Sequence, residues 1–152
     1  MEETGKDKAK KLFIGKAVEG ATAGTNCCQA VICAYSEQFG VSAEDAFRMT
    51  EGFGLGMGGL MDTCGAVTGM FLTIGLANSE SGFKDPLITK KDTYDKVLYA
   101  ASRFREQRGS LYCRDLKTED GPMPLDCCTD CVCTAAGILD EMLPEIASAK
   151  AR

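Results

Sequence analysis

Apolar residues recur every three to four positions along most of the chain, which is the period of an amphipathic helix. Period-two alternation, typical of strands, is scarce. The pattern predicts helices over residues 7–23, 27–39, 43–53, 64–76, 89–108 and 126–143. We therefore expect an all-α fold of about six helices. We also expect residues 1–152 to form a single domain, because a chain of 152 residues can bury a core of its own.

Capping residues, glycines and a proline mark the ends of the predicted helices. Asn26 and Ser42 precede helical segments and can accept a hydrogen bond from the first turn. Gly24 and Gly40 follow helical segments and are typical helix-ending residues. Pro144 follows the last segment and is expected to end that helix, because proline lacks the backbone N–H that a helix interior needs.

A glycine-rich stretch over residues 52–65 interrupts the helical pattern around Cys64. Gly54, Gly56 and Gly59 spell G-x-G-x-x-G, as in a dinucleotide-binding loop. That loop needs a buried strand before it, whereas the preceding residues have helical spacing. We expect instead a tight turn that delivers Cys64 to the start of a buried helix, where backbone N–H groups favour the thiolate.

Gly65 and Gly69 lie four residues apart and therefore share one face of this buried helix. Small residues let a second helix approach closely, so we expect another cysteine to reach Cys64 from a neighbouring helix. The alternative interpretation is that the two glycines only ease helix packing.

Charge and composition exclude several classes of function. The net charge is −5 and histidine is absent. An acidic chain does not neutralise phosphates, so we expect no nucleic-acid partner. Without imidazole, Cys-His and Ser-His catalytic pairs are excluded. No secretory signal follows Met1, and the apolar run 66–77 is shorter than the roughly 20 residues that cross a bilayer, so we expect a cytoplasmic protein outside the membrane.

Nine cysteines are unusual in a chain expected in a reducing compartment. Cys27 lies at a predicted helix start, and Cys113 precedes Arg114. Both settings lower the pKa of a thiol. Cys128 and Cys131 form a C-x-x-C pair, a spacing used for disulfide exchange and for metal binding. A single such pair does not predict a zinc ribbon, and no strand pattern indicates a thioredoxin fold.

Four stretches carry a common set of cysteine and glycine motifs: NCCQAV, GFGLGMGGLMDTCGAVTGM, GSLYCRDL and CCTDCVCTAAGIL. They resemble the redox-active family named C_GCAxxG_C_C. The resemblance extends from about residue 20 to residue 140 and includes Cys-Gly-Ala-x-x-Gly at residues 64–69. It implies a small bacterial or archaeal α-helical protein with redox activity. Related sequence is fused to haem domains in split-Soret cytochromes, which implies electron transfer and an iron–sulfur cluster as a candidate cofactor.

The resemblance places the four characteristic cysteines of the family at Cys27, Cys64, Cys113 and Cys128, with Cys127 as the alternative for the fourth. The chain departs from the family by carrying additional cysteines: Cys28, Cys33, Cys131, Cys133 and one of Cys127 and Cys128. It contains no C-x-x-C-H, so covalent haem attachment is excluded.

The leading hypothesis is that Cys27, Cys64, Cys113 and Cys128 converge on one site. With Cys131 as a resolving partner, the site would exchange disulfides with an unidentified redox partner protein. The close rival is an iron–sulfur cluster held by the same four thiolates. A structural zinc site is less favoured, because a chain of this size folds without a metal.

The competing class of function is a binding module with inert thiols. Its surface would consist of the glycine stretch and of flexible methionines: Met49, Met57, Met61 and Met70. No pair of carboxylates stands out for acid–base catalysis. The sequence leaves open whether the chain forms a homodimer.

Overall fold

The computed structural model describes residues 2–117 and 126–151, in which all regular secondary structure is helical. The α-helices are α1 (Gly5–Ile14), α2 (Cys27–Tyr35), α3 (Ala43–Met49), α4 (Gly54–Gly58), α5 (Gly65–Asn78), α6 (Lys90–Arg108), α7 (Cys113–Leu116) and α8 (Asp126–Lys150). Short 3-10 helices are η1 (Ser36–Phe39) and η2 (Glu51–Phe53). The predicted all-α class is confirmed. The expected number of about six helices agrees roughly with this part of the chain, because α4 and α7 are single turns.

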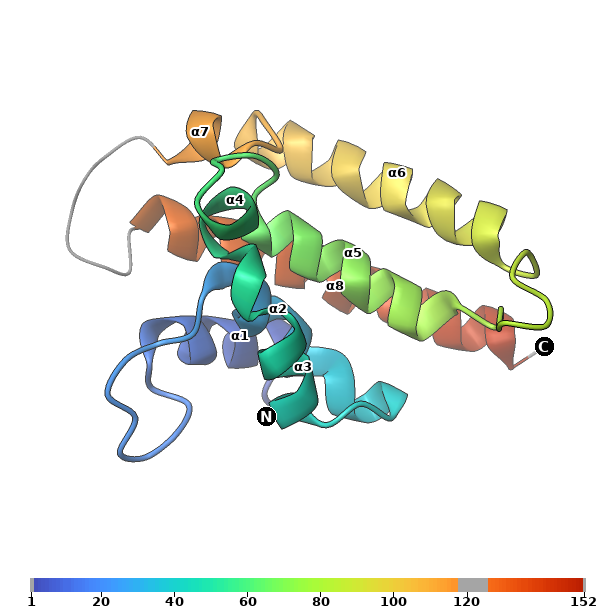
Figure 1. Cartoon of the computed structure of the whole chain (residues 1–152), viewed down its shortest axis with the longest axis horizontal. Helices are drawn as coiled ribbons and strands as arrows, with labels where there is room; N and C mark the ends of the chain where they lie inside the picture. The colour runs from blue at the N-terminus through green and yellow to red at the C-terminus, as the bar shows by residue number, and fades with distance from the viewer. Residues whose placement is uncertain (1, 118–125, 152) are drawn as a thin grey trace.

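The three longest helices, α5, α6 and α8, lie side by side (Figure 1). α5 and α8 run in the same direction, and α6 runs in the opposite direction (Figure 1). α5 also packs against α2, while α8 packs against α1. The first turns of α5 and α8 therefore lie at the same end of the molecule, where α4 and α7 are also found (Figure 1).

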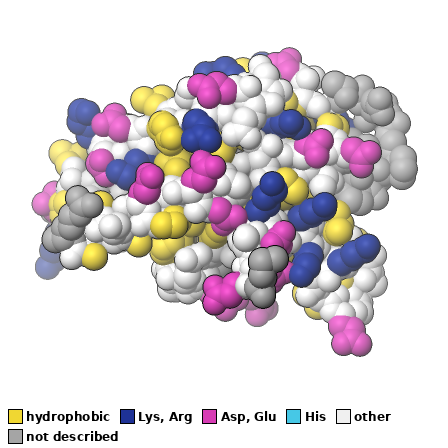
Figure 2. All heavy atoms as spheres, turned by 180° about the vertical axis from the view of Figure 1, so that it is seen from behind, with side chains coloured by type: hydrophobic (Ala, Val, Ile, Leu, Met, Phe, Trp, Pro, Cys, Tyr) yellow, Lys and Arg dark blue, Asp and Glu magenta, His cyan; other side chains and the backbone are white. Residues whose placement is uncertain are grey.

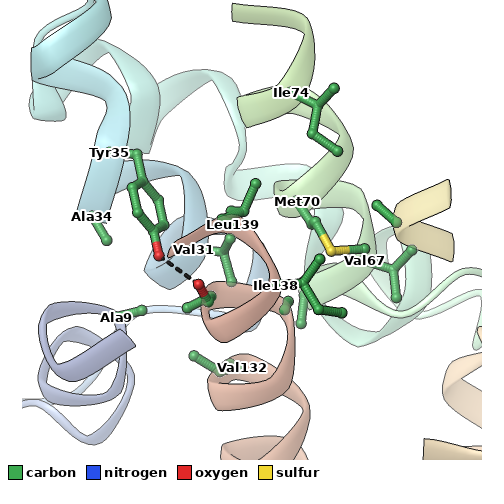
Figure 3. Packing of buried hydrophobic residues seen from close by; sticks show 14 of the residues in the cluster. Ala9, Val31, Ala34, Tyr35, Val67, Met70, Ile74, Val132, Ile138 and Leu139 are labelled. Carbon is green, nitrogen blue, oxygen red and sulfur yellow. Dashed lines mark hydrogen bonds between the residues drawn. The ribbon is translucent and has the colours of Figure 1, made fainter. Parts of the chain in front are cut away.

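The core consists largely of aliphatic side chains from α2, α5 and α8. Val31 on α2, Val67 and Met70 on α5, and Leu139 on α8 are completely buried and lie close together (Figure 3). Complete burial of such a side chain stabilises the fold by about 1.5–3 kcal/mol. These contacts hold α5 and α8 in fixed register, so the positions of their first turns are fixed as well.

A polar link through Tyr35 joins α1, α2 and α8 inside this core. The Tyr35 hydroxyl donates to the carbonyl oxygen of Ala136 at 2.8 Å (Figure 3) and lies 2.9 Å from Oδ1 of Asp140. The other carboxylate oxygen of Asp140 accepts the backbone N–H of Lys6 at 3.0 Å. Gly5 lies against the Tyr35 ring, where a Cβ would overlap the ring atoms. Burial and Asp140 raise the pKa of Tyr35, so its hydroxyl stays a donor.

The predicted helix starts at Asn26 and Ser42 are confirmed. The Asn26 side chain accepts the N–H of Gln29 at 2.8 Å, and the Ser42 hydroxyl accepts the N–H of Asp45 at 3.0 Å. The last turns of both predicted segments differ from expectation, because they form the 3-10 helices η1 and η2. Tightened last turns are common where a helix gives way to a loop.

The first helix is shorter than the sequence predicts. Helical spacing continues through Ala17 and Ala21, and the predicted segment runs to residue 23, but α1 ends at Ile14. Gly15 follows in the left-handed conformation, with a φ of 79°. A left-handed glycine ends a helix by satisfying its last carbonyl groups, and here it outweighs the weak helical pattern of the small residues beyond it.

The last helix is longer than the sequence predicts. The sequence predicts that Pro144 ends it, but α8 continues to Lys150. The proline removes one backbone hydrogen bond, whereas Leu143 and Ile146 beside it are buried in the core. Packing therefore outweighs the break. The Lys150 ammonium also donates to the carbonyl oxygen of Ala77 at the end of α5, at 2.9 Å.

The surface mixes charges of both signs. On the face shown in Figure 2, Lys and Arg side chains are interspersed with Asp and Glu. Ion pairs between Arg103 and Glu141 at 3.1 Å, and between Arg108 and Asp130 at 3.6 Å, join α6 to α8. Among the helices of residues 2–117 and 126–151, none has the length and apolar character needed to cross a membrane.

α2 packs directly on the glycine face of α5. A Cβ on Gly69 would lie 2.8 Å from the carbonyl oxygen of Cys28 and 3.0 Å from Cβ of Val31. A Cβ on Gly65 would overlap the sulfur of Cys27. The expectation that these glycines admit a second helix carrying a cysteine is therefore confirmed, and Cys27 is the cysteine that they admit.

This close approach predicts different effects of alanine at two glycines of α5. Gly69→Ala forces a methyl group against the α2 backbone and should lower the free energy of unfolding by about 1–3 kcal/mol. Gly75→Ala is the matched control, because nothing lies within 4 Å of the added methyl group. It should raise the free energy of unfolding by about 0.5–1 kcal/mol through helix propensity. Urea unfolding of the reduced proteins measures both, and equal effects would refute the role of the close approach.

Candidate functional site

A cavity of about 460 Å³ opens at the end of the molecule where α5 and α8 begin. Its walls include the first residues of α2, α5, α7 and α8 together with residues of the glycine stretch. Apolar side chains contribute to the lining, among them Phe13, Leu55 and Leu116. Six of the nine cysteines line this one cavity: Cys27, Cys64, Cys113, Cys127, Cys128 and Cys131.

The structure thus brings together all five cysteines that the sequence analysis assigned to the site: Cys27, Cys64, Cys113, Cys128 and Cys131. Cys127, the alternative to Cys128, lines the same cavity. The other three cysteines lie elsewhere. Cys28 is completely buried, Cys33 packs in a small cluster with Ile32 and Ala46, and Cys133 lines a separate polar groove.

The glycine stretch winds into a left-handed turn beside the cavity. Leu55, Gly56 and Met57 have φ values of 51°, 61° and 73°. The left-handed conformation costs a non-glycine residue roughly 1–2 kcal/mol. A Cβ on Gly56 would lie 2.7 Å from Cβ of Cys113, so only glycine fits there. The expected tight turn is confirmed. It positions Cys113 as well as Cys64, whereas the sequence pattern predicted this role for Cys64 alone.

Backbone hydrogen bonds connect this turn to the segment before α7. The N–H of Cys113 donates to the carbonyl oxygen of Asp62 at 2.7 Å, and the N–H of Cys64 donates to that of Leu111 at 2.7 Å. An antiparallel bridge pairs Thr63 with Tyr112 between them. Cys64 and Cys113, 49 positions apart in the sequence, are thereby held next to each other by the backbone itself.

The same turn fixes Cys27 at the start of α2. The Asn26 amide donates to the carbonyl oxygen of Glu51 at 3.1 Å, and a Cβ on Gly54 would lie 2.9 Å from Cβ of Asn26. The backbone of Leu55 lies near the Cys27 sulfur and acts to lower the pKa of this thiol. Glycine at position 54 therefore lets the turn approach the cap of α2 closely enough for its backbone to reach this sulfur.

Neighbouring thiols influence one another across the cavity. Cys64 and Cys131 belong to one buried cluster, where Cys131 raises the pKa of Cys64, and Cys127 raises the pKa of Cys128. Cys27 interacts electrostatically with Cys64. All nine cysteines are free thiols in the structure. The first pair joins the start of α5 to α8, so it links two helices that are far apart in sequence.

The sequence-based expectation of lowered thiol pKa values is wrong for Cys64 and Cys27. The neighbouring Cys131 thiol, together with burial, raises the pKa of Cys64 well above its ordinary value, although N–H groups at the start of α5 act in the opposite direction. Burial and the neighbouring Cys64 raise the pKa of Cys27 to about 11, against 9.0 for an ordinary thiol. The free energy lost when a thiolate is removed from water is larger than its stabilisation by the N–H groups of a helix start.

The same correction applies to the other two cysteines of the family set. Burial raises the pKa of Cys113, and Cys64 adds to the effect. The guanidinium of Arg114, expected to lower this pKa, stacks over the Tyr112 ring at 4.4 Å. Burial and Cys127 raise the pKa of Cys128 to about 12. These sulfurs are therefore held as neutral thiols around neutral pH.

The methionine surface of the binding-module alternative is wrong in part. Met70 is completely buried in the core, and Met61 accepts a hydrogen bond from the thiol of Cys113 with a sulfur–sulfur distance of 3.9 Å. Met49 and Met57 are exposed. The spacing of Met70 in the apolar helix is the signal that could have identified it as a core residue.

The donor set of the cavity fits an iron–sulfur cluster in its chemistry, because such clusters are bound by cysteine thiolates. Histidine is absent from the chain, so sulfur is the soft donor available. Within residues 2–117 and 126–151, no three side chains of Cys, Asp or Glu are grouped closely enough to enclose a metal ion. In the thiol form, the sulfurs are therefore distributed over the cavity wall.

Comparison with known proteins yields one family. A family model described as "Putative redox-active protein (C_GCAxxG_C_C)" matches residues 25–142. No curated protein and no solved structure gives a match. The matched residues cover most of the chain and include all nine cysteines and the glycine turn. The chain therefore belongs to the C_GCAxxG_C_C family.

Proposed function

We propose that the cavity is a thiol redox centre whose two-electron couple is the pair Cys64 and Cys131. The observation that carries the proposal is that these two buried thiols share one packed cluster beside a cavity that four further cysteines line. Oxidation would form one S–S bond and release two protons and two electrons. The redox activity in the description of the family supports this assignment.

The pair Cys127 and Cys128 is less suited to be the stable couple. Consecutive Cα atoms are about 3.8 Å apart across a trans peptide, whereas Cα atoms joined by a disulfide usually lie about 4.4–6.8 Å apart. A bond between neighbours would therefore be strained. Cys64 immediately precedes α5 and Cys131 lies on α8, so this pair carries no such restriction.

The raised thiol pKa values support a reducing role for the couple. Oxidants of the thioredoxin class are strong when their reduced form is stabilised as a thiolate. Here burial and neighbouring thiols disfavour the thiolate of Cys64. The reduced protein is therefore not stabilised by ionisation of this thiol. A less stable reduced form favours donation of electrons to a partner disulfide. The physiological acceptor in this proposal is a disulfide of a partner protein.

An iron–sulfur cluster is the second candidate, and a specific observation favours it. The four family cysteines Cys27, Cys64, Cys113 and Cys128 all line a cavity of about 460 Å³. These four residues would hold the cluster. When bound, it would supply one-electron transfer in place of disulfide exchange. The glycine turn would then support two of the ligands, Cys27 and Cys113, through its backbone.

Mild oxidation tests the thiol couple. Treatment of the reduced protein with diamide should remove two hydrogens and produce a peptide pair linked through Cys64 and Cys131, as seen by peptide mass mapping. Cys131→Ser should abolish this product without loss of helix content. Cys133→Ser is the matched control on the same helix, because Cys133 lies outside the cavity, and it should oxidise normally. A first disulfide between any other two cysteines would contradict the assignment.

Purification without air tests the cluster. A bound cluster should give absorption bands between about 320 and 450 nm together with stoichiometric iron and sulfide. Cys113→Ser should remove the bands, whereas Cys33→Ser, outside the cavity, should keep them. Colourless, iron-free wild-type protein that also fails to assemble a cluster from added iron and sulfide would exclude this candidate.

The pKa of Cys27 predicts a distinct pH dependence of alkylation. Only the thiolate reacts, so the rate of iodoacetamide labelling at Cys27 should rise about tenfold per pH unit up to about pH 10 and level off near its pKa of about 11. An ordinary thiol levels off near its pKa of 9.0. Denatured protein is the control, in which Cys27 should show the ordinary profile. A native profile that levels off at or below pH 9 would contradict the raised pKa.

A further inference from the structure

The proposed couple is buried, which limits how it can react. Cys64 is 6% exposed and Cys131 is 3% exposed. Thiol–disulfide exchange requires the attacking sulfur to contact a sulfur of the partner's disulfide directly. A disulfide of a partner protein is too bulky to reach these two sulfurs inside the cavity. A more accessible cysteine must therefore stand between the couple and the partner.

Three half-buried cysteines line the cavity: Cys27, Cys127 and Cys128. Cys128 is packed against the core cluster that contains Cys64 and Cys131, whereas Cys127 is not part of that packing. Cys27 also packs against the cluster, but it lies on α2 with its sulfur against Gly65. Cys128 thus combines partial exposure and contact with this core with a place on the same helix as Cys131.

The position of Cys128 on α8 provides the route to the couple. Cys128 precedes Cys131 by three residues, so the two side chains are neighbours on one face of the helix. Cys131 in turn is buried in the same packed cluster as Cys64 and lines the same cavity. The three sulfurs therefore form a continuous series from the half-exposed first turn of α8 to the buried start of α5.

We propose that Cys128 is the relay thiol through which the buried couple exchanges electrons with an accessible disulfide; this rests on the proposed function of Cys64 and Cys131. The Cys128 thiolate attacks the partner disulfide, forms a mixed disulfide and releases one partner thiolate, which takes up a proton. Cys131 then attacks the Cys128 sulfur and releases the second partner thiol.

In the last step the Cys64 thiolate attacks the Cys131 sulfur and frees Cys128. The net result is one S–S bond between Cys64 and Cys131, two thiols on the former disulfide, and an unchanged Cys128. Two electrons and two protons pass from the protein to the partner. The cycle needs no oxidant besides the partner disulfide itself.

The intermediate bond between Cys128 and Cys131 is short-lived for a geometric reason. Side chains three residues apart on a helix have Cβ atoms about 5–6 Å apart, whereas a disulfide needs about 3.5–4.5 Å. The bond requires the first turn of α8 to loosen, and strained disulfides are the readily exchanged ones. Replacement of this bond by the Cys64–Cys131 disulfide relieves the strain and therefore favours the last step.

Oxidised glutathione, an accessible disulfide, is the probe that tests the relay. Cys128→Ser should slow formation of the Cys64–Cys131 disulfide at least about tenfold, because the couple loses its accessible partner. Cys133→Ser, the control on the same helix but outside the cavity, should stay close to the wild-type rate. Wild-type kinetics in Cys128→Ser, or equal slowing in both variants, would overturn the relay.

Two further measurements keep the outcomes separate. In Cys131→Ser the mixed disulfide cannot be resolved, so glutathione should remain bound to Cys128. Recovery of glutathione on Cys27 or Cys127 would overturn the relay. This result does not depend on whether Cys128→Ser folds. Diamide is small enough to enter the cavity and should still oxidise the couple in Cys128→Ser. Failure of diamide to link Cys64 and Cys131 in the wild-type protein would instead refute the proposed function.

Discussion

The close approach of α2 to α5 at Gly65 and Gly69 is the contact on which the cysteine cavity depends. Any side chain at these positions would push α2 away, and the Cys27 sulfur would leave the neighbourhood of Cys64. The same helix pair carries the buried residues Val31 and Val67, so the core and the cavity share one interface. Helix packing and the approach of Cys27 to Cys64 therefore depend on the same two glycines. Both require that these positions carry no side chain.

Burial dominates the electrostatics of the cavity. Helix starts are usually invoked to activate cysteines, and N–H groups do reach the sulfurs of Cys64 and Cys27. The surrounding apolar walls and the neighbouring thiols outweigh these N–H groups. A thiolate in the cavity lacks hydration by water, and it repels any second thiolate beside it. The cysteines that line this cavity are thus held as neutral thiols. Its chemistry depends on contact between sulfurs and on access from outside more than on a single activated nucleophile.

Much of this could be predicted from particular residues. Helical spacing and the caps Asn26 and Ser42 gave the fold class and most helix starts, because these signals are local. The separation of Gly65 and Gly69 predicted a close helix partner. The early end of α1 and the continuation of α8 past Pro144 could not be predicted, because local preference competes there with packing against distant helices. The pKa values were missed for a similar reason, since burial is a property of the whole fold.

The sequence by itself determined that the protein is helical, that its glycine stretch is a turn beside Cys64, and which residue types could do chemistry in the absence of histidine. Only the tertiary structure decided that six cysteines from four separate segments line one cavity while Cys28, Cys33 and Cys133 do not. It also decided that Cys64 and Cys131 share one buried cluster. Periodicity fixes which face of each helix is apolar, but the register between helices comes from side-chain packing, and that register sets which sulfurs touch.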